Sequence, residues 1–171
     1  MNALFEAGAE VGAFIAEREW SFCIIGGAAV ARWGEPRATL DIDITLLTGW
    51  GEEDTYVRAL LERFPSRIPD AHEFALNRRV LLIRASNGRD VDIVLGALPF
   101  EAEMVRRAIP VAFAPGVVLS CCTAEDLFVM KAFADRRRDW LDAESIIIRQ
   151  PELDKGYILK HLAELCEVKE D

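Results

Sequence analysis

The sequence predicts a mixed α/β (α+β) fold, in which a mixed sheet is flanked by helices and followed by a C-terminal helical segment. Short apolar runs bounded by glycine or proline alternate with segments of helical periodicity. Asn87-Gly88 lies between two β-rich runs, which is a strong hairpin signal and argues against a purely parallel sheet. Helical patterns dominate after Thr123. Helices therefore precede, interrupt and follow the strands, as in mixed folds.

The first part of the chain is expected to alternate helices and strands. The expected elements are a helix, a buried strand ending in a glycine turn, a short helix, a second strand and an amphipathic helix, over residues 3–19, 20–27, 28–33, 38–48 and 52–64. The short helix must end before Pro36, whose ring prevents its continuation.

The second part begins with the hairpin of residues 79–96, followed by a helix over 99–108 and extended chain over 111–123. Thr123 opens a T-x-x-D sequence that resembles a capping box, so a helix should start there. Breaks are expected near Pro151 and Gly156. We expect an α/β core over residues 1–122 and a helical segment over 123–171, packed as one compact unit.

Composition restricts the function classes. The chain has 171 residues, is 51% hydrophobic and carries a formal charge of −9, which disfavours indiscriminate binding to nucleic acid. A local basic patch could still form from residues 78–79, 106–107 and 136–138. No apolar run approaches the ~20 residues of a membrane-spanning helix, and the N-terminus lacks the basic region of a signal peptide. A soluble, cytoplasmic protein is expected.

The four cysteines predict reduced thiols rather than a zinc site. Their spacing contains no C-x-x-C pattern, and His72 and His161 lie far from them in sequence.

Asp41 and Asp43 are two carboxylates in an otherwise apolar strand. Residues two apart share one face of a strand, at about 6.6 Å along the chain, while Ile42 and Ile44 face the other side. A close anionic pair raises the pKa of one member unless a cation neutralises it. Magnesium accepts such oxygens and retains water or phosphate ligands. Two solvated aspartates on an edge strand would have the same sequence pattern.

A later strand supplies a third carboxylate, Asp92, between Val91 and Ile93. Asp90 shares its face but lies nearer the turn, so we expect it at the rim of the site. Three converging carboxylates require cations, and two divalent ions about 3.5–4 Å apart serve this purpose in phosphoryl and nucleotidyl transfer.

Gly26-Gly27 closes the first strand. Glycines let the backbone approach a ligand, and helix N-terminal amides favour phosphate oxygens. A glycine pair is also a common feature of ordinary turns.

The order of strand, Gly-Gly, thirteen intervening residues, D-x-D and a later acid-bearing strand resembles the DNA polymerase β-type nucleotidyltransferase signature. Within that superfamily, "IGGAAVARWGEPRATLDIDI" and "EDLFVMKAFADRRRDWLDAESI" are similar to the AbiEii-like toxin nucleotidyltransferases. The resemblance covers about residues 20 to 148.

This resemblance implies that Asp41 and Asp43 hold two metal ions, Mg²⁺ or Mn²⁺, together with the triphosphate. Asp92 would hold the catalytic metal and help to deprotonate the attacking hydroxyl. Gly26 and Gly27 would contact the β- and γ-phosphates through their amides. Many members have serine where Gly27 stands, so that hydroxyl contact is missing here.

The rest of the implied nucleotide site consists of Arg37, Thr39, Lys131 and Asp139, with Asp142 as a further acid. Arg37 could bind phosphate or pair with the aspartates. An alternative for the helical residues is a salt-bridged outer stripe at helical spacing, formed by Lys131, Asp135, Arg138 and Asp142.

The implied reaction moves a nucleoside monophosphate from a nucleoside triphosphate to an acceptor. The AbiEii-like resemblance suggests RNA, such as a tRNA end, or a protein as the acceptor, with a cognate toxin or antitoxin as partner. The acidic charge of the chain keeps a small-molecule acceptor of the aminoglycoside type open. A non-catalytic nucleotide-binding or partner-binding protein of the same fold is the remaining alternative.

Overall fold

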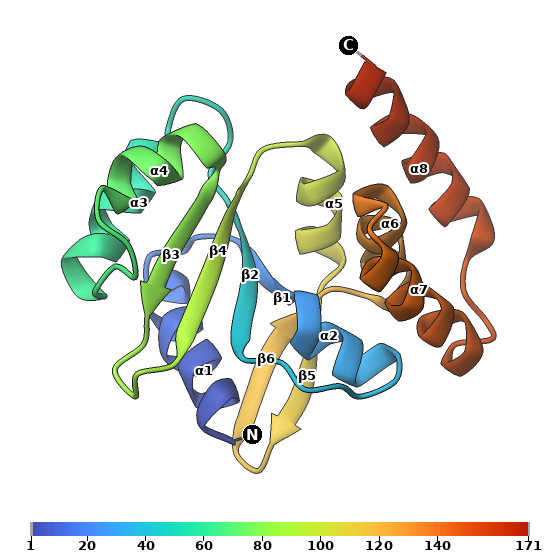
Figure 1. Ribbon diagram of the computed structural model, residues 1–171, viewed down its shortest axis with the longest axis horizontal. Helices are drawn as coiled ribbons and strands as arrows, with labels where there is room; N and C mark the ends of the chain where they lie inside the picture. Colours follow the sequence, from blue (N-terminus) through green and yellow to red (C-terminus); the bar gives the residue numbers. More distant parts are fainter. Residues whose placement is uncertain (1, 171) are drawn as a thin grey trace.

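The computed structural model describes residues 2–170, with helices and strands alternating along the chain (Figure 1). The helices are α1 Asn2–Ala16, α2 Gly26–Trp33, α3 Glu53–Arg63, α4 Ala71–Arg78, α5 Pro99–Arg107, α6 Ala124–Ala134, α7 Arg137–Arg149 and α8 Lys155–Glu170. The strands are β1 Phe22–Ile25, β2 Asp41–Leu47, β3 Val80–Arg84, β4 Asp90–Gly96, β5 Ile109–Ala114 and β6 Val117–Cys121.

All six of these strands form one mixed sheet, in the order β3-β4-β2-β1-β6-β5. Two pairs are parallel, β2 with β4 and β1 with β6, and the other neighbours are antiparallel. The predicted fold class and the hairpin around residues 87–88 are therefore confirmed. The parallel pairing of β2 with β4 matters most for the site, because each strand carries two aspartates.

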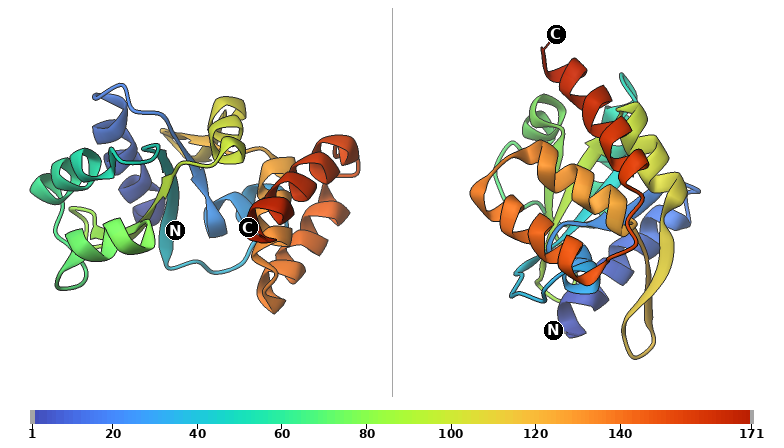
Figure 2. Two further views of the ribbon diagram at one scale, coloured as in Figure 1. Left: turned by 90° about the horizontal axis from the view of Figure 1, so that it is seen from above. Right: turned by 90° about the vertical axis from the view of Figure 1, so that its right-hand side faces the viewer.

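Helices cover the sheet from several sides. Helix α1 packs on the face that carries Ile42, where Gly8 lies against the side chains of Ile42 and Leu119. Helices α3 and α4 lie on the side of β3, whereas α6, α7 and α8 gather on the opposite side of the molecule (Figure 1). The same separation is visible from above (Figure 2).

The structure differs from the expected elements at five places. The short helix begins at Gly26 rather than residue 28, and helix α4 was not predicted. The stretch 111–123, expected as extended chain, is a hairpin that turns at Gly116, where φ is +74°. In the C-terminal segment the break near Pro151 is confirmed, but Gly156 lies inside α8. A further break occurs at Asp135, which has a left-handed φ of 53°.

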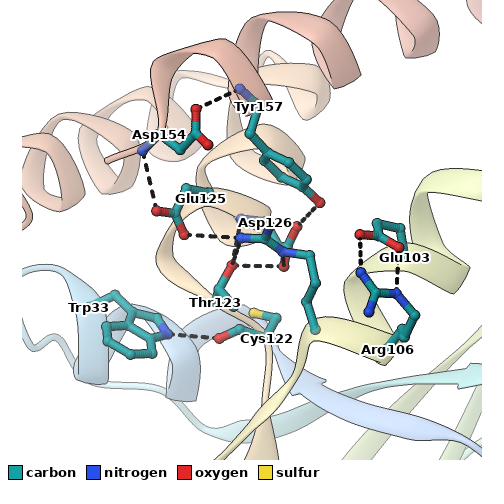
Figure 3. A network of polar contacts seen from close by, with 10 residues as sticks. Trp33, Glu103, Arg106, Cys122, Thr123, Glu125, Asp126, Asp154 and Tyr157 are labelled. Carbon is teal, nitrogen blue, oxygen red and sulfur yellow. Dashed lines mark hydrogen bonds and ion pairs between the residues drawn. The ribbon is translucent and has the colours of Figure 1, made fainter. Parts of the chain in front are cut away.

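Helix α8 is attached to the start of α6 by a buried polar network (Figure 3). Thr123 caps α6 as predicted, because its Oγ1 accepts a hydrogen bond of 3.3 Å from the backbone amide of Asp126. Asp126 is fully buried and accepts a 2.5 Å hydrogen bond from the Tyr157 hydroxyl. Arg107 on α5 also donates to Asp126, at 3.3 Å. Burial and the contact with Asp126 raise the pKa of Tyr157. The division at residues 122 and 123 stays a prediction.

Three arginines from the runs that could form a basic patch pair with three different acids. Arg79 pairs with Glu53, Arg106 with Glu103 and Arg107 with Asp126. Cys23, Cys121 and Cys122 are buried free thiols, Cys166 is an exposed one, and burial raises the pKa of Cys23. Within residues 2–170, no helix combines the length and apolar character needed to cross a bilayer.

Candidate active site

Four aspartates line up across the parallel strands β2 and β4. Asp41 pairs with Asp90 and Asp43 with Asp92, and directly paired residues project from the same face of a sheet. The alternate residues Ile42, Ile44, Val91 and Ile93 are fully buried. The structure thus places the three predicted metal ligands on one face. We refer to Asp41, Asp43, Asp90 and Asp92 as the acid row.

The surroundings of Asp43, in the acid row, disfavour the ionised form of its carboxyl group. Burial raises the pKa of its carboxyl group to about 6, and the charges of Asp41 and Asp92 act in the same direction. The Gly27 amide donates to Asp43 Oδ2 at 3.4 Å, which opposes the shift only in part. An ionised Asp43 would therefore be stabilised by a cation bound nearby.

The glycine pair allows α2 to begin directly against Asp43. Gly26 has φ +62°, and a Cβ atom added there would lie 1.9 Å from Asp43 Oδ2. A Cβ atom on Gly27 would lie 2.4 Å from Thr39 Oγ1. Both positions therefore require glycine for packing, in addition to any phosphate contact. Thr39 Oγ1 lies 3.3 Å from both the backbone oxygen and Oδ1 of Asp41, so it positions that residue.

Lys131 joins helices α6 and α7 through a buried ion-pair cluster. Its Nζ lies 3.0 Å from Asp139 Oδ1 and 2.9 Å from Asp142 Oδ2. Lys131 is 9% exposed, and Asp139 and Asp142 are 3% and 4% exposed. Arg37 binds the same Asp142 with two hydrogen bonds of 2.9 and 3.0 Å.

These contacts exclude a single outer stripe along one helix. Helix α6 ends at Ala134 and Asp135 is left-handed, so Lys131 and Asp139 reach each other from different helices. Asp135 instead accepts a hydrogen bond from Trp140 Nε1. Burial alone would raise the pKa of Asp139, but its ion pairs with Arg136 and Lys131 hold it below the usual range. The pairs with Arg37 and Lys131 likewise lower the pKa of Asp142 against the effect of burial.

A cavity of about 770 Å³ lies between Asp41 and Asp43 of the acid row and this cluster. Eight of the nine predicted site residues line it, namely Gly26, Gly27, Arg37, Thr39, Asp41, Asp43, Lys131 and Asp139. Its lining also includes Arg136 and Arg138, and the apolar side chains of Leu40, Leu127 and Met130. We refer to Arg37, Lys131, Arg136 and Arg138 as the basic wall. The carboxylates of Asp41 and Asp43 and the cations of the basic wall therefore line the same cavity.

Arg138 differs from the other cations of the basic wall. Arg136 pairs with Asp139 at 2.6 Å, and Arg37 and Lys131 share the acids of α7. Among residues 2–170, Arg138 makes no ion pair and no side-chain hydrogen bond. It is thus the wall residue with its charge available to a ligand.

Asp92, the ninth predicted residue, lies outside the cavity lining and is bound to Arg67. Arg67 follows α3 and also reaches Asp90 Oδ2 at 3.4 Å, while Arg84 binds Asp90 at 3.0 Å. Burial raises the pKa of Asp92 despite the opposing charge of Arg67. Arg67 was not predicted, because a lone arginine in a connecting segment carries no motif.

The donor chemistry of the acid row suits a divalent ion. Mg²⁺ and Mn²⁺ bind carboxylate oxygens, and Asp41, Asp43 and Asp92 supply them from one sheet face. With the side chains as they stand, no group of three or more His, Cys, Asp or Glu residues within 2–170 is arranged to hold a metal. The third carboxylate, that of Asp92, is paired with Arg67 instead.

No family model and no curated protein matches this chain. Solved structures do match it. The antibiotic-resistance factor ANT(2'')-Ia in solution has a TM-score of 0.60 at 19% identity, covering 97% of this chain and 92% of its own. An antigenic nucleotidyltransferase-like protein from Paracoccidioides brasiliensis has a TM-score of 0.59 at 15% identity, with 99% and 90% covered.

The lincosamide antibiotic adenylyltransferase LnuA, in its lincomycin-bound structure, has a TM-score of 0.51 at 11% identity, covering 82% of this chain and 94% of its own. At these identities the likeness concerns the fold. The chain has the nucleotidyltransferase fold, as the resemblance in sequence implied. The narrower AbiEii-like resemblance stays a prediction.

Proposed function

We propose that this protein is a metal-dependent nucleotidyltransferase, which moves a nucleoside monophosphate from a nucleoside triphosphate to an acceptor and releases pyrophosphate. The observation that carries the proposal is the cavity between the acid row and the basic wall. A triphosphate with its metal ions has matching polarity, because the metal suits the carboxylates and the phosphate oxygens suit the cations.

The residues have distinct roles in this reaction. Asp41, Asp43 and Asp92 would hold Mg²⁺ or Mn²⁺, which neutralises charge on the triphosphate when bound. The amides of Gly26 and Gly27 open α2 toward the phosphates. Arg138 attracts the phosphate oxygens, while Lys131 keeps Asp139 and Asp142 neutralised beside them. Asp92 accepts the proton of the attacking hydroxyl. Catalysis then depends mainly on positioning and charge stabilisation.

For the acceptor we infer a hydroxyl group on a small neutral or cationic molecule. Asp90 and Asp92 lie on β4 beside β2, outside the cavity lining, and the whole chain carries a charge of −9. Both features oppose a polyanionic acceptor. ANT(2'')-Ia is also known in complex with adenylyl-2''-tobramycin, at a TM-score of 0.56 and 19% identity, over 96% of this chain and 98% of its own. An RNA or protein acceptor with a toxin–antitoxin partner remains the alternative from the sequence resemblance.

One labelling experiment tests both parts of the proposal. The protein is incubated with each α-³²P nucleoside triphosphate, Mg²⁺ or Mn²⁺ and a whole-cell extract, which is then separated into RNA, protein and small molecules. We expect label in the small-molecule fraction. Label in RNA or protein would support the alternative acceptors. Asp41→Asn should abolish labelling, and Glu144→Gln, which changes an exposed acid of α7 outside the cavity lining, should retain it.

The non-catalytic alternative makes a different prediction. If nucleotide binds with the affinity of the wild type in Asp41→Asn, and wild-type protein labels no fraction, then the protein is a nucleotide-binding module and the proposed reaction is wrong.

A further inference from the structure

The backbone of Arg67 is held in place by contacts with strand β3. The segment between α3 and α4 runs along the free edge of β3, where the Arg67 amide donates to the Leu82 carbonyl at 3.0 Å. The Arg84 amide donates to the Pro65 carbonyl at 2.9 Å, and Ser66 forms a β-bridge with Ile83. The Arg67 backbone is therefore fixed as part of the sheet edge.

The side chain of Arg67 crosses β3 and reaches the acid row on β4. It pairs with Asp92 through Nη1, and its Nε lies 3.4 Å from Asp90 Oδ2. The side chains of Arg67 and Asp92 are only 21% and 24% exposed. Among residues 2–170, Arg67 makes the only ion pair to Asp92. It therefore supplies the charge that Asp92 needs when no other cation is bound.

A second arginine serves Asp90 but leaves Asp92 alone. Arg84 binds Asp90 Oδ1 at 3.0 Å from a more exposed position, with 48% of its side chain exposed. If Arg67 left Asp92, Asp90 would keep Arg84 as its partner. The guanidinium of Arg67 could also remain on Asp90. The acid row thus tolerates release of Asp92 alone.

We propose that Arg67 is the intramolecular counter-ion of Asp92 in the metal-free protein, and that a divalent metal ion displaces it from that carboxylate. This inference rests on the proposed function, which assigns Asp92 to the metal. Both cations need the same half-buried oxygens, so each lowers the apparent affinity of the other. Arg67 therefore sets how tightly the site binds metal before any nucleotide arrives.

The test is a titration of the nucleotide-free, 171-residue protein with Mn²⁺. The electron paramagnetic resonance signal of free Mn²⁺ measures how much of the metal is bound. Arg67→Gln should tighten Mn²⁺ binding about tenfold, which corresponds to one lost ion pair of about 1.4 kcal/mol. Arg84→Gln is the matched control, since it removes an arginine of the same acid row, and should change affinity less than about twofold. Asp92→Asn should weaken binding, and the double variant Arg67→Gln/Asp92→Asn should bind no more tightly than Asp92→Asn.

A thermal shift measurement covers the case of an unstable variant. Arg67→Gln should melt below wild type without metal and gain more from Mn²⁺ than wild type does, because metal replaces the missing charge. Arg67→Lys keeps the charge but loses the two-pronged geometry, so its Mn²⁺ affinity should lie between the two.

The outcomes separate this inference from the function on which it rests. If wild type binds Mn²⁺ through Asp92 but Arg67→Gln binds it equally or more weakly, the exchange is wrong and the metal site survives. If neither wild type nor Arg67→Gln binds Mn²⁺ in an Asp92-dependent way, both the exchange and the proposed metal site are wrong.

Discussion

Gly27 and Thr39 are packed so closely that a single methyl group on Gly27 would lie 2.4 Å from Thr39 Oγ1 and 2.8 Å from Thr39 Cβ. The contact joins the first turn of α2 to the chain that leads into β2. It therefore sets the distance between the α2 amides and the acid row.

Gly27→Ala should lower the free energy of unfolding by about 1–3 kcal/mol, because the added methyl group overpacks this contact. Urea denaturation measures the change. Thr39→Gly removes the obstructing atoms, so the double variant should recover part of the loss and show coupling in a double-mutant cycle. Additive effects of the two substitutions would contradict the packing argument.

Asp43→Asn should stabilise the metal-free protein by about 1–2 kcal/mol at neutral pH, while nucleotidyl transfer falls at least about a hundredfold. Burial raises the pKa of Asp43 to about 6 in the folded state, from an ordinary value near 3.8. Its favourable contribution is thus complete below about pH 4 and lost as pH rises through 6. The stability gain of the variant should appear over the same range.

The measurement for Asp43 is urea denaturation from pH 4 to 8 in the presence of a chelator. Asp90→Asn is the control, since Asp90 is more exposed and already paired with Arg84. An Asp43→Asn variant that is less stable than wild type at pH 7.5 would show that the carboxylate is neutralised within the protein itself.

Lys131→Met should destabilise the protein by about 3–5 kcal/mol, because it leaves two buried carboxylates without their shared cation. Arg136→Gln is a suitable comparison, since 76% of the Arg136 side chain is exposed, and should cost less than about 1 kcal/mol. Lys131 and Arg136 both pair with Asp139 in the wild type. A similar loss of stability in the two variants would therefore argue against burial as the deciding factor.

The effect of Lys131→Met should also depend on pH. The lowered pKa values of Asp139 and Asp142 contribute stability that is present above their ordinary pKa and lost as pH falls through the lowered values. The difference between wild type and Lys131→Met should therefore shrink in acid below about pH 4. Unfolding curves at neutral pH and near pH 3 measure this change.

Arg138→Ala should weaken binding of a nucleoside triphosphate with Mg²⁺ about tenfold, as expected for the loss of one charge-assisted phosphate contact. Its melting temperature should stay close to that of wild type, because Arg138 has no ion-pair partner within residues 2–170. Arg137→Ala is the matched control, since Arg137 is exposed and does not line the cavity. Calorimetric titration would compare the three proteins; equal affinities would remove Arg138 from the binding site.

Local sequence patterns predicted most of the fold, and the elements that they did not predict were missed for physical reasons. Strand β2 and the β3–β4 hairpin carry clear alternation and a turn signal, so both were found. Helix α4 buries only Ala71 and Ala75, and its apolar residues form too weak a stripe to be recognised. The break after α6 occurs at Asp135 in a left-handed conformation, without the glycine or proline that usually marks such an end.

Some residues of the candidate site were likewise predictable from sequence, and others were not. Gly26, Gly27, Asp41 and Asp43 lie in one continuous motif, so their sequence spacing implied their proximity. The contact of Arg67 with Asp92 depends on residues 65–67 pairing along β3, which no local pattern reports. Arg138 was noted only as part of a possible basic patch or an outer stripe, because its place in the cavity lining depends on the helix break at Asp135.

The parallel pairing of β2 with β4 also has a consequence for the order of folding. Parallel neighbours need a long crossover, and here it contains α3, α4 and β3, so β4 joins β2 only after that connection closes. The β3–β4 hairpin and the chain segment carrying Arg67 are close in sequence, so we expect them to assemble early. In that order of events, Asp92 would meet Asp41 and Asp43 with Arg67 already paired to it, so three carboxylates would not converge without a cation.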